Sequence, residues 1–186
     1  MRIRLLLLPL ILLATLTPHR TERKVILWAW ERPEDLTFIN PEKVGVAFLA
    51  KTIYLRGDKV VVKPRMQPLK LAPGTKLVAV VRIETNHQDL PSFSTAQLER
   101  VSRAILDLSV TSVVQIDFDA TVSQRNFYRS LLTEVRRGLP RSVGLSITAL
   151  ASWCAGDDWL RDLPINEAVP MLFRLGVDRP QFQRRL

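Results

Sequence analysis

Apolar runs of strand length alternate with helical patterns along this chain, and that alternation constrains its fold more than any other feature. Strands are expected at residues 25–30, 44–49, 77–84, 113–119, 143–150 and 169–174. Helices are expected after the Ser94 capping signal, up to Gly138, and briefly over residues 157–163. Strands that alternate with helices indicate βα units and a mainly parallel sheet.

Two shorter patterns interrupt the alternation. Residues 52–55 and 59–63 flank Arg56-Gly57-Asp58, a turn signal that predicts an inserted hairpin. The turn at residues 31–35 is expected to open a short helix, and the prolines between residues 64 and 74 predict a loop.

Polar residues recur on one face of several expected strands, which favours a TIM-type barrel. In such barrels one strand face packs on outer helices and the other looks inward. No Gly-rich phosphate loop follows the first strand, which argues against a dinucleotide-binding fold. A full barrel needs eight strands and typically about 250 residues. The 186-residue chain supplies about six, so we predict a partial (β/α) barrel, with an open sheet as the alternative.

The strand at residues 113–119 ends in two carboxylates on one face. Gln115, Asp117 and Asp119 alternate with Val114, Ile116 and Phe118, because successive strand residues point to opposite faces. Repulsion between neighbouring carboxylates raises the pKa of one of them. Asp117 and Asp119 are therefore candidates for acid/base chemistry, with a solvated strand end as the structural alternative. Two carboxylates on one strand are too few to define a metal site.

Neighbouring strands extend this polar face. Arg82 and Glu84 share a face of the third strand, and Ser146, Thr148 and Ser152 share a face of the fifth. Trp28, Trp30 and Trp153 are expected beside them. We expect Arg82 to pair with Asp117, which leaves Asp119 nearest the open end of the barrel. The predicted catalytic residues are Asp119, Asp117 and Glu84, and the predicted substrate-binding residues are Arg82, Trp28, Trp30, Thr148 and Trp153.

The N-terminal segment is typical of a targeting sequence. Arg2 and Arg4 precede an apolar run over residues 5–16, which suits a signal peptide or an uncleaved membrane anchor. We predict a signal or anchor at residues 1–18, an incomplete barrel domain at 24–178 and a tail at 179–186. The protein is accordingly expected to be exported and to be periplasmic, anchored in the inner membrane or secreted.

Composition narrows the remaining choices. The net charge is +9, but the basic residues are scattered and no basic helix face or nucleic-acid signature occurs, so nucleic acid is not expected as a partner. The single cysteine, Cys154, excludes an internal disulfide. No cofactor is expected, and the sequence defines no oligomeric state.

Four segments carry a family resemblance: VILWAWERPEDL at residues 25–36, VQIDFDA at 114–120, residues 145–153, and VPMLFRLG at 169–176. With them, residues 24–178 resemble the bacterial domain of unknown function 3142. The resemblance implies an exported protein with a barrel related in appearance to glycoside hydrolases, and it carries no established activity. Members of that family are longer, so the chain resembles their N-terminal half to two-thirds.

A second resemblance is to chitinase-like barrels, whose fourth strand ends in Asp-x-x-Asp-x-Asp-x-Glu. Asp117 and Asp119 match the middle acids, but Val114 replaces the first Asp and Thr121 replaces the catalytic Glu. The mechanism of those enzymes therefore does not transfer. Glu84 and Glu31 are the nearest alternative acids by strand position.

Two functions follow from these patterns. The first is a carbohydrate-active hydrolase that acts on envelope or extracellular glycans, with a pair of carboxylates as such chemistry requires. The second is a non-catalytic glycan-binding or envelope-scaffold protein that keeps the barrel without a general acid.

Overall fold

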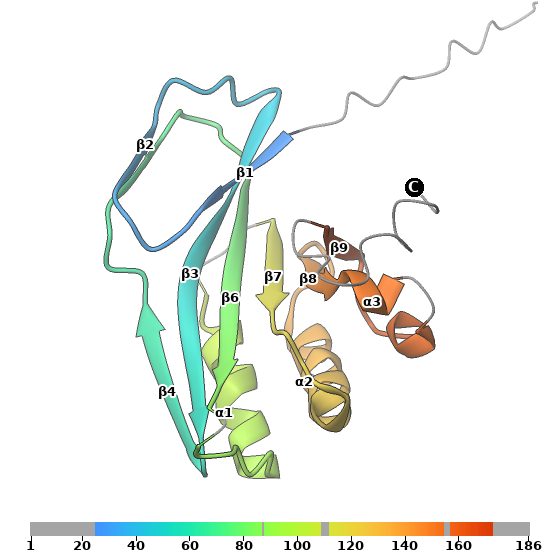
Figure 1. The fold of residues 1–186 in the computed structure, drawn as a ribbon. Coiled ribbons are helices and arrows are strands. Elements are labelled where there is room, and N and C mark those ends of the chain that lie inside the picture. The colour runs from blue at the N-terminus through green and yellow to red at the C-terminus, as the bar shows by residue number, and fades with distance from the viewer. Residues whose placement is uncertain (1–24, 87, 109–111, 155–156, 173–186) are drawn as a thin grey trace, which may run out of the picture.

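The fold is an α/β half-barrel built on a curled sheet (Figure 1). The computed structural model describes residues 25–86, 88–108, 112–154 and 157–172. Six parallel strands pair in sequence order: β1 (Val25–Ala29), β3 (Val44–Arg56), β6 (Leu77–Thr85), β7 (Val113–Asp117), β8 (Gly144–Leu150) and β9 (Glu167–Met171). The predicted order is confirmed, and no switch point interrupts it.

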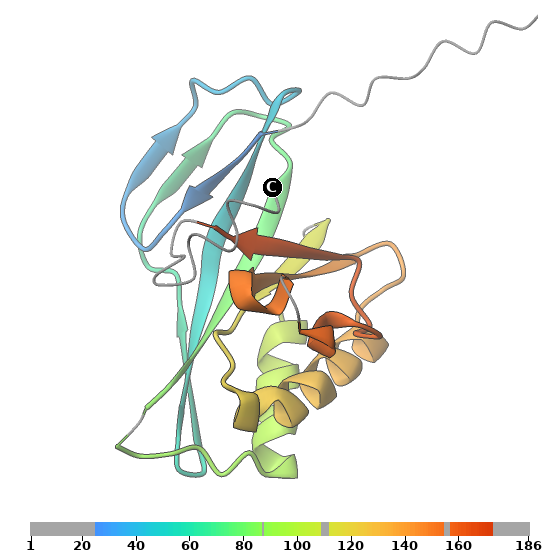
Figure 2. The same ribbon diagram turned by 45° about the vertical axis from the view of Figure 1, so that its right-hand side comes forward.

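Helices cover one face of this sheet (Figure 2). They are α1 (Thr95–Leu106) and α2 (Arg125–Gly138), with the short α3 (Ala151–Cys154) and 3-10 turns η1 (Val122–Gln124) and η2 (Asp158–Leu160) near the ends of β7 and β8. As predicted, the Ser94 side chain caps α1 by accepting from the backbone N–H of Gln97. The main core lies between these helices and the sheet, where Ile53, Val81, Ile116 and Ile147 are fully buried.

The predicted strands at residues 44–49 and 52–55 are one long strand, β3. Its register against β6 shifts between Leu49 and Lys51, so a bulge lies at Ala50. Before the bulge Leu49 lies on the face opposite the helices, and after it Thr52 takes that face while Ile53 joins the helix-side core. Because the bulge reverses the apolar/polar alternation at Ala50, the sequence pattern of this one strand resembles two strands with a break between them.

The inserted hairpin is confirmed. Strand β4 (Lys59–Pro64) pairs antiparallel with the second half of β3, and the register from Arg56–Lys59 to Lys51–Pro64 leaves a two-residue loop. Gly57 occupies the first loop position with φ of +48°, a conformation that favours glycine in this kind of turn.

Three other predictions need correction. Residues 34–36 form strand β2 (Glu34–Leu36), not a helix. This strand pairs with β5 (Leu69–Leu71) in a small separate sheet, and β5 lies within the segment that was expected to be a loop. Instead of spanning 157–163, the short helix is the single turn η2. The last strand lies two residues earlier than predicted, at Glu167–Met171, and residues 173–174 fall outside the described part.

The predicted signal or anchor at residues 1–18, its apolar run at 5–16 and the tail at 179–186 also lie outside the described residues. Among the helices that the structure does describe, none has the length and apolarity needed to cross a membrane.

Candidate functional site

Strand register builds a polar row across the face of the sheet opposite the helices. Thr52 pairs with Arg82, and Arg82 pairs with Asp117. Thr148 follows Ile147, the partner of Ile116, and its hydroxyl donates to Asp117 Oδ1 at 2.7 Å. The row therefore crosses four neighbouring strands, and the expected polar face is present.

Arg82 organises the centre of this row. Its Nε donates to Glu84 Oε1 at 2.8 Å and one terminal nitrogen donates to Asp117 Oδ2 at 3.3 Å. The guanidinium carbon also lies 5.7 Å from the ring centroid of Trp30. Burial lowers the pKa of Arg82, but the Glu84 hydrogen bond and the charge of Asp117 outweigh it and raise that pKa above its usual value. The predicted pairing of Arg82 with Asp117 is confirmed.

Asp117 is the buried member of the site, with 5% of its surface exposed. Burial raises its pKa above the usual aspartate value, although the Thr148 hydrogen bond and the Arg82 charge act to lower it. The net direction is upward because desolvation penalises the charged form more than one long ion pair restores. Asp117 thus has both oxygens engaged and no open approach from solvent.

Asp119 differs from Asp117 in its exposure to solvent and in its partners. It is exposed, two residues beyond Asp117, just as Glu84 lies two residues beyond Arg82. No described residue makes a hydrogen bond or ion pair with its side chain, yet its charge raises the pKa values of both Arg82 and Asp117. Asp119 is therefore a free carboxylate next to the polar row, at the carboxyl end of the sheet.

A deeper layer of the same face supports the row. The Gln115 side-chain amide donates to Ser146 Oγ at 3.0 Å, and both residues are buried. This bond joins β7 to β8 one layer below Asp117 and Thr148. Buried polar side chains are here satisfied by their strand neighbours, as burial requires.

An open cleft of about 760 Å³ lies beside Arg82 and Glu84, over β3 and β4. Its walls also include Trp30, Glu31, Thr52, Tyr54 and Lys63. A second hollow of about 470 Å³ continues past Tyr54 and Glu84 toward Gln88. The two hollows share Tyr54 and Glu84, so these side chains form a ridge between them.

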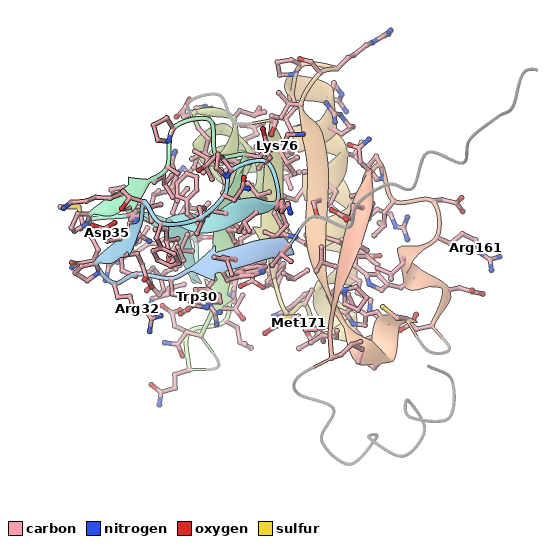
Figure 3. All side chains as sticks on the ribbon, turned by 90° about the horizontal axis from the view of Figure 1, so that it is seen from above. Trp30, Arg32, Asp35, Lys76, Arg161 and Met171 are labelled. Carbon is pink, nitrogen blue, oxygen red and sulfur yellow. The ribbon has the colours of Figure 1, made fainter. Side chains whose placement is uncertain are left out.

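The tryptophans predicted for this face are placed unequally. Trp30 is exposed at the cleft, and Trp28 lies against its ring at a centroid distance of 5.4 Å. Figure 3 shows Trp30 and Met171, the last residue of β9, along the same side of the molecule. Trp28 is half-buried and packs against Ala47, Leu49 and Val80. It supports Trp30 more than it lines the cleft.

Trp153 requires a correction. It is buried in the helix-side core, where its ring lies 5.4 Å from Trp159 and 6.5 Å from Tyr128. Strand β8 ends at Leu150 and the chain enters α3, so strand alternation no longer places the residues that follow. For the same reason Ser152 is exposed on α3 and does not extend the polar row.

Tyr54, Thr52 and Lys63 also line the cleft and were not among the predicted site residues. A usable signal was present, because Thr52 and Tyr54 alternate with the apolar Ile53 and Leu55. Glu31 does line the cleft, but one of its oxygens accepts the backbone N–H groups of Met66 and Gln67 and holds that loop. Among the described residues no cluster of three or more His, Cys, Asp or Glu side chains could hold a metal ion.

Comparison with known proteins shows a likeness to a solved structure. No protein-family model and no curated protein matches the chain, so the resemblance to the domain of unknown function 3142 stays a prediction. The solved structure of the Bacillus cereus spore cortex-lytic enzyme SleL is similar at 16% sequence identity and a TM-score of 0.42. The likeness covers 70% of this chain but only 36% of that one.

Proposed function

We propose that this protein is carbohydrate-active: it binds a glycan in the cleft beside Trp30 and hydrolyses a glycosidic bond with Asp119 as the acting carboxylate. One observation carries the proposal. Arg82 holds Glu84 and Asp117, whereas Asp119, two residues past the end of β7, is exposed and has no partner among the described residues. The carboxyl ends of the strands are the place where barrel enzymes carry their functional side chains.

The chemistry of the cleft supports a sugar ligand. The rings of Trp30 and Tyr54 offer flat apolar surfaces on which the C–H face of a sugar ring can pack, while Thr52, Arg82 and Glu84 supply donors and acceptors for hydroxyl groups. A cleft of this mixed character, open to solvent, is suited to a polar ligand with apolar faces.

Each acid has a distinct proposed role. Asp119 acts as nucleophile or base, because it is exposed and has no hydrogen-bond or ion-pair partner among the described residues. Asp117 tunes the site through its charge and through its hold on Arg82 and Thr148. Glu84 is the candidate acid, since a glycosidase needs a second carboxyl to protonate the leaving oxygen.

A second candidate function is non-catalytic glycan binding. The observation that favours it is the ion pair between Glu84 and Arg82, because this pair occupies the carboxyl group that a hydrolase would need as its acid. Under this alternative the cleft binds the same ligand, but no bond is cleaved.

Substitution of the two aspartates tests these roles. Asp119→Asn is expected to lower the rate of turnover of a glycan panel by at least about a hundredfold. Circular dichroism should show that the variant stays folded. Asp107→Asn, which changes an exposed aspartate at the end of α1, is the matched control and should leave turnover unchanged. Glycan affinity without any turnover in the unmodified protein favours the binding function. If Asp119→Asn leaves both turnover and affinity intact in a folded protein, the proposed site is wrong.

Export is also part of the proposal. The support is the sequence pattern of Arg2, Arg4 and the apolar run at residues 5–16. Cell fractionation and N-terminal sequencing of the mature protein are expected to find it in the envelope or outside the cell. Full-length protein with Met1 intact in the soluble cytoplasm contradicts this.

A further inference from the structure

The hairpin of β3 and β4, beside the cleft, carries three cations in a fixed pattern. In the antiparallel pairing of β3 with β4, Thr52 faces Lys63 and Arg56 faces Lys59. Directly opposed residues project on the same side of a sheet. Lys63, Arg56 and Lys59 therefore lie on the face that carries Thr52, Tyr54 and the polar row, and all three are exposed.

Two of these cations flank the aromatic ridge of the cleft. Lys63 Nζ lies 5.1 Å and the Arg56 guanidinium carbon 5.9 Å from the ring centroid of Tyr54. Neither side chain, nor that of Lys59, makes an ion pair with a described carboxylate. Arg82, in contrast, is engaged by both Glu84 and Asp117. The cation at the centre of the site is thus paired with carboxylates, whereas the cations at the margin have no ion-pair partner among the described residues.

The hairpin that carries this margin is fastened to the core. The Gln97 amide nitrogen donates to the backbone oxygens of Gly57 at 3.0 Å and Lys59 at 3.2 Å, and its own oxygen accepts from the backbone N–H of Phe93. Gln97 is 1% exposed. The hairpin tip is therefore held at the start of α1, which fixes the backbone positions of Arg56 and Lys59.

We infer that the ligand of this cleft is an acidic polysaccharide, whose carboxylate-bearing sugar units pass over Tyr54 and pair with Lys63 and Arg56. The inference rests on the proposed glycan function and names its substrate class. Hydroxyl groups of the same chain reach Glu84 and Asp119 as hydrogen-bond acceptors. The two hollows on either side of Tyr54 give room for more than one sugar unit.

The acids at the centre of the site favour this ligand over a nucleic acid. A single-stranded nucleic acid carries a phosphate on every nucleotide, and such dense negative charge is opposed by the carboxylates of Glu84 and Glu31 in the cleft. In an acidic polysaccharide, neutral hydroxyl groups separate the charges, which matches cations at the margin and acceptors at the centre.

The experiment measures binding by calorimetry to the full chain. The probes are hexamers of galacturonate, mannuronate and hyaluronan type, their methyl-esterified neutral forms, chitohexaose and oligothymidylate. The expected result is that at least one acidic hexamer binds at least about tenfold more tightly than its ester, with affinity that falls as salt rises. The double variant Lys63→Gln/Arg56→Gln is expected to remove that preference.

Two control variants test whether the effect comes from the lost charge at the cleft. Lys76→Gln/Arg100→Gln removes the same charge at exposed positions outside the cleft and should keep the preference. Lys63→Arg/Arg56→Lys keeps the charge and should keep it as well, which separates lost charge from a disturbed hairpin.

The other outcomes overturn the inference in distinguishable ways. Esters or chitohexaose that bind as tightly as the acids, with no effect of the double variant, overturn the acidic substrate class and leave the glycan function standing. Oligothymidylate that binds more tightly than every glycan, and loses affinity in the double variant, replaces the glycan with nucleic acid. Binding to none of the probes overturns both the inference and the proposed function.

Discussion

Ile116 and Asp117 are neighbours in β7 and both are buried, yet opposite faces of the sheet hold them by different forces. Ile116 is fully buried among apolar side chains from α2 and the adjacent strands, where dispersion and the hydrophobic effect stabilise it. Asp117 is 5% exposed and is retained by Arg82 and Thr148. Burial alone therefore does not separate a packing residue from a site residue, whereas the chemistry of the contacts does.

The two faces also differ in what the removal of a side-chain group does to the neighbouring residues. On the helix side a missing methyl group leaves a cavity that its neighbours fill only in part. On the polar side a missing group leaves its partner unsatisfied, because each polar side chain bonds a specific neighbour on the next strand. Polar layers of this kind fix relative strand position, and here they bring Arg82 beside Asp117.

The largest effect is expected on the helix side. Ile116→Ala should lower the free energy of unfolding by about 2–5 kcal/mol, since it removes three methyl or methylene carbons from a fully buried position. Chemical denaturation measures this, and Ile116→Val, with an expected loss of about 0.5–1.5 kcal/mol, is the graded control. Equal losses for the two variants would mean that packing at this position is looser than the contacts indicate.

The hairpin clamp comes next. Gln97→Ala removes three part-buried hydrogen bonds to the backbone of Gly57, Lys59 and Phe93. The Gly57 oxygen keeps the backbone N–H of Ser92, so a loss of about 1–3 kcal/mol is expected, mainly from the other two bonds. Exposed Gln88→Ala is the control and should change stability by less than about 0.5 kcal/mol. Hydrogen exchange at the hairpin amides of the Gln97 variant should quicken more than exchange in β7. Uniform quickening throughout the sheet would show that Gln97 stabilises the whole core.

A smaller effect is expected in the deeper polar layer. Ser146→Ala leaves the Gln115 amide without its acceptor, at a cost of about 1 kcal/mol. Ser152→Ala, at an exposed position on α3, should have almost no effect. Thermal denaturation of both variants decides the point. A neutral result at Ser146 would mean that Gln115 finds another partner.

Sequence alternation was sufficient to predict the sheet and the centre of the polar row. The order of six parallel strands, the hairpin at Gly57 and the shared face of Arg82, Glu84 and Asp117 all follow from period-two patterns. The pairing of Arg82 with Asp117 followed from strand order alone. Local pattern is strong where a strand has one apolar and one polar face.

The errors arose where local pattern gives way to tertiary contacts. The bulge at Ala50 reverses the alternation within β3, so one strand resembled two. Strands β2 and β5 have three residues each, too few to show a period. Trp153 follows the end of β8, and its position is set by packing against Tyr128 and Trp159, which no short sequence window contains.

The smallest expected effect is a change in how stability depends on pH. Because burial raises the pKa of Asp117 in the folded protein, the folded state binds a proton there more tightly than the unfolded chain does. The resulting stabilisation is fully present below the usual aspartate pKa of 3.8 and is lost as pH rises through the raised value. Wild-type protein should therefore lose stability relative to Asp117→Asn as the pH is raised from about 3 to 7.

Denaturation of both proteins at each pH checks this difference, and the comparison cancels the titrating groups that do not interact with Asp117. Asp157 acts in the opposite direction: burial raises its pKa, but the hydrogen bonds from Arg125 and Trp159 outweigh burial and lower it, so its contribution grows with pH in both proteins alike. If the free energies of unfolding of the two proteins changed in parallel with pH, Asp117 would have the same pKa in the folded and unfolded states. A wild-type curve that instead gains on the variant as pH rises would show that the Arg82 ion pair outweighs burial. Asp117 would then be a salt-bridge partner whose charge is favoured by the fold, and the division of roles between Asp117 and Asp119 would rest on exposure alone.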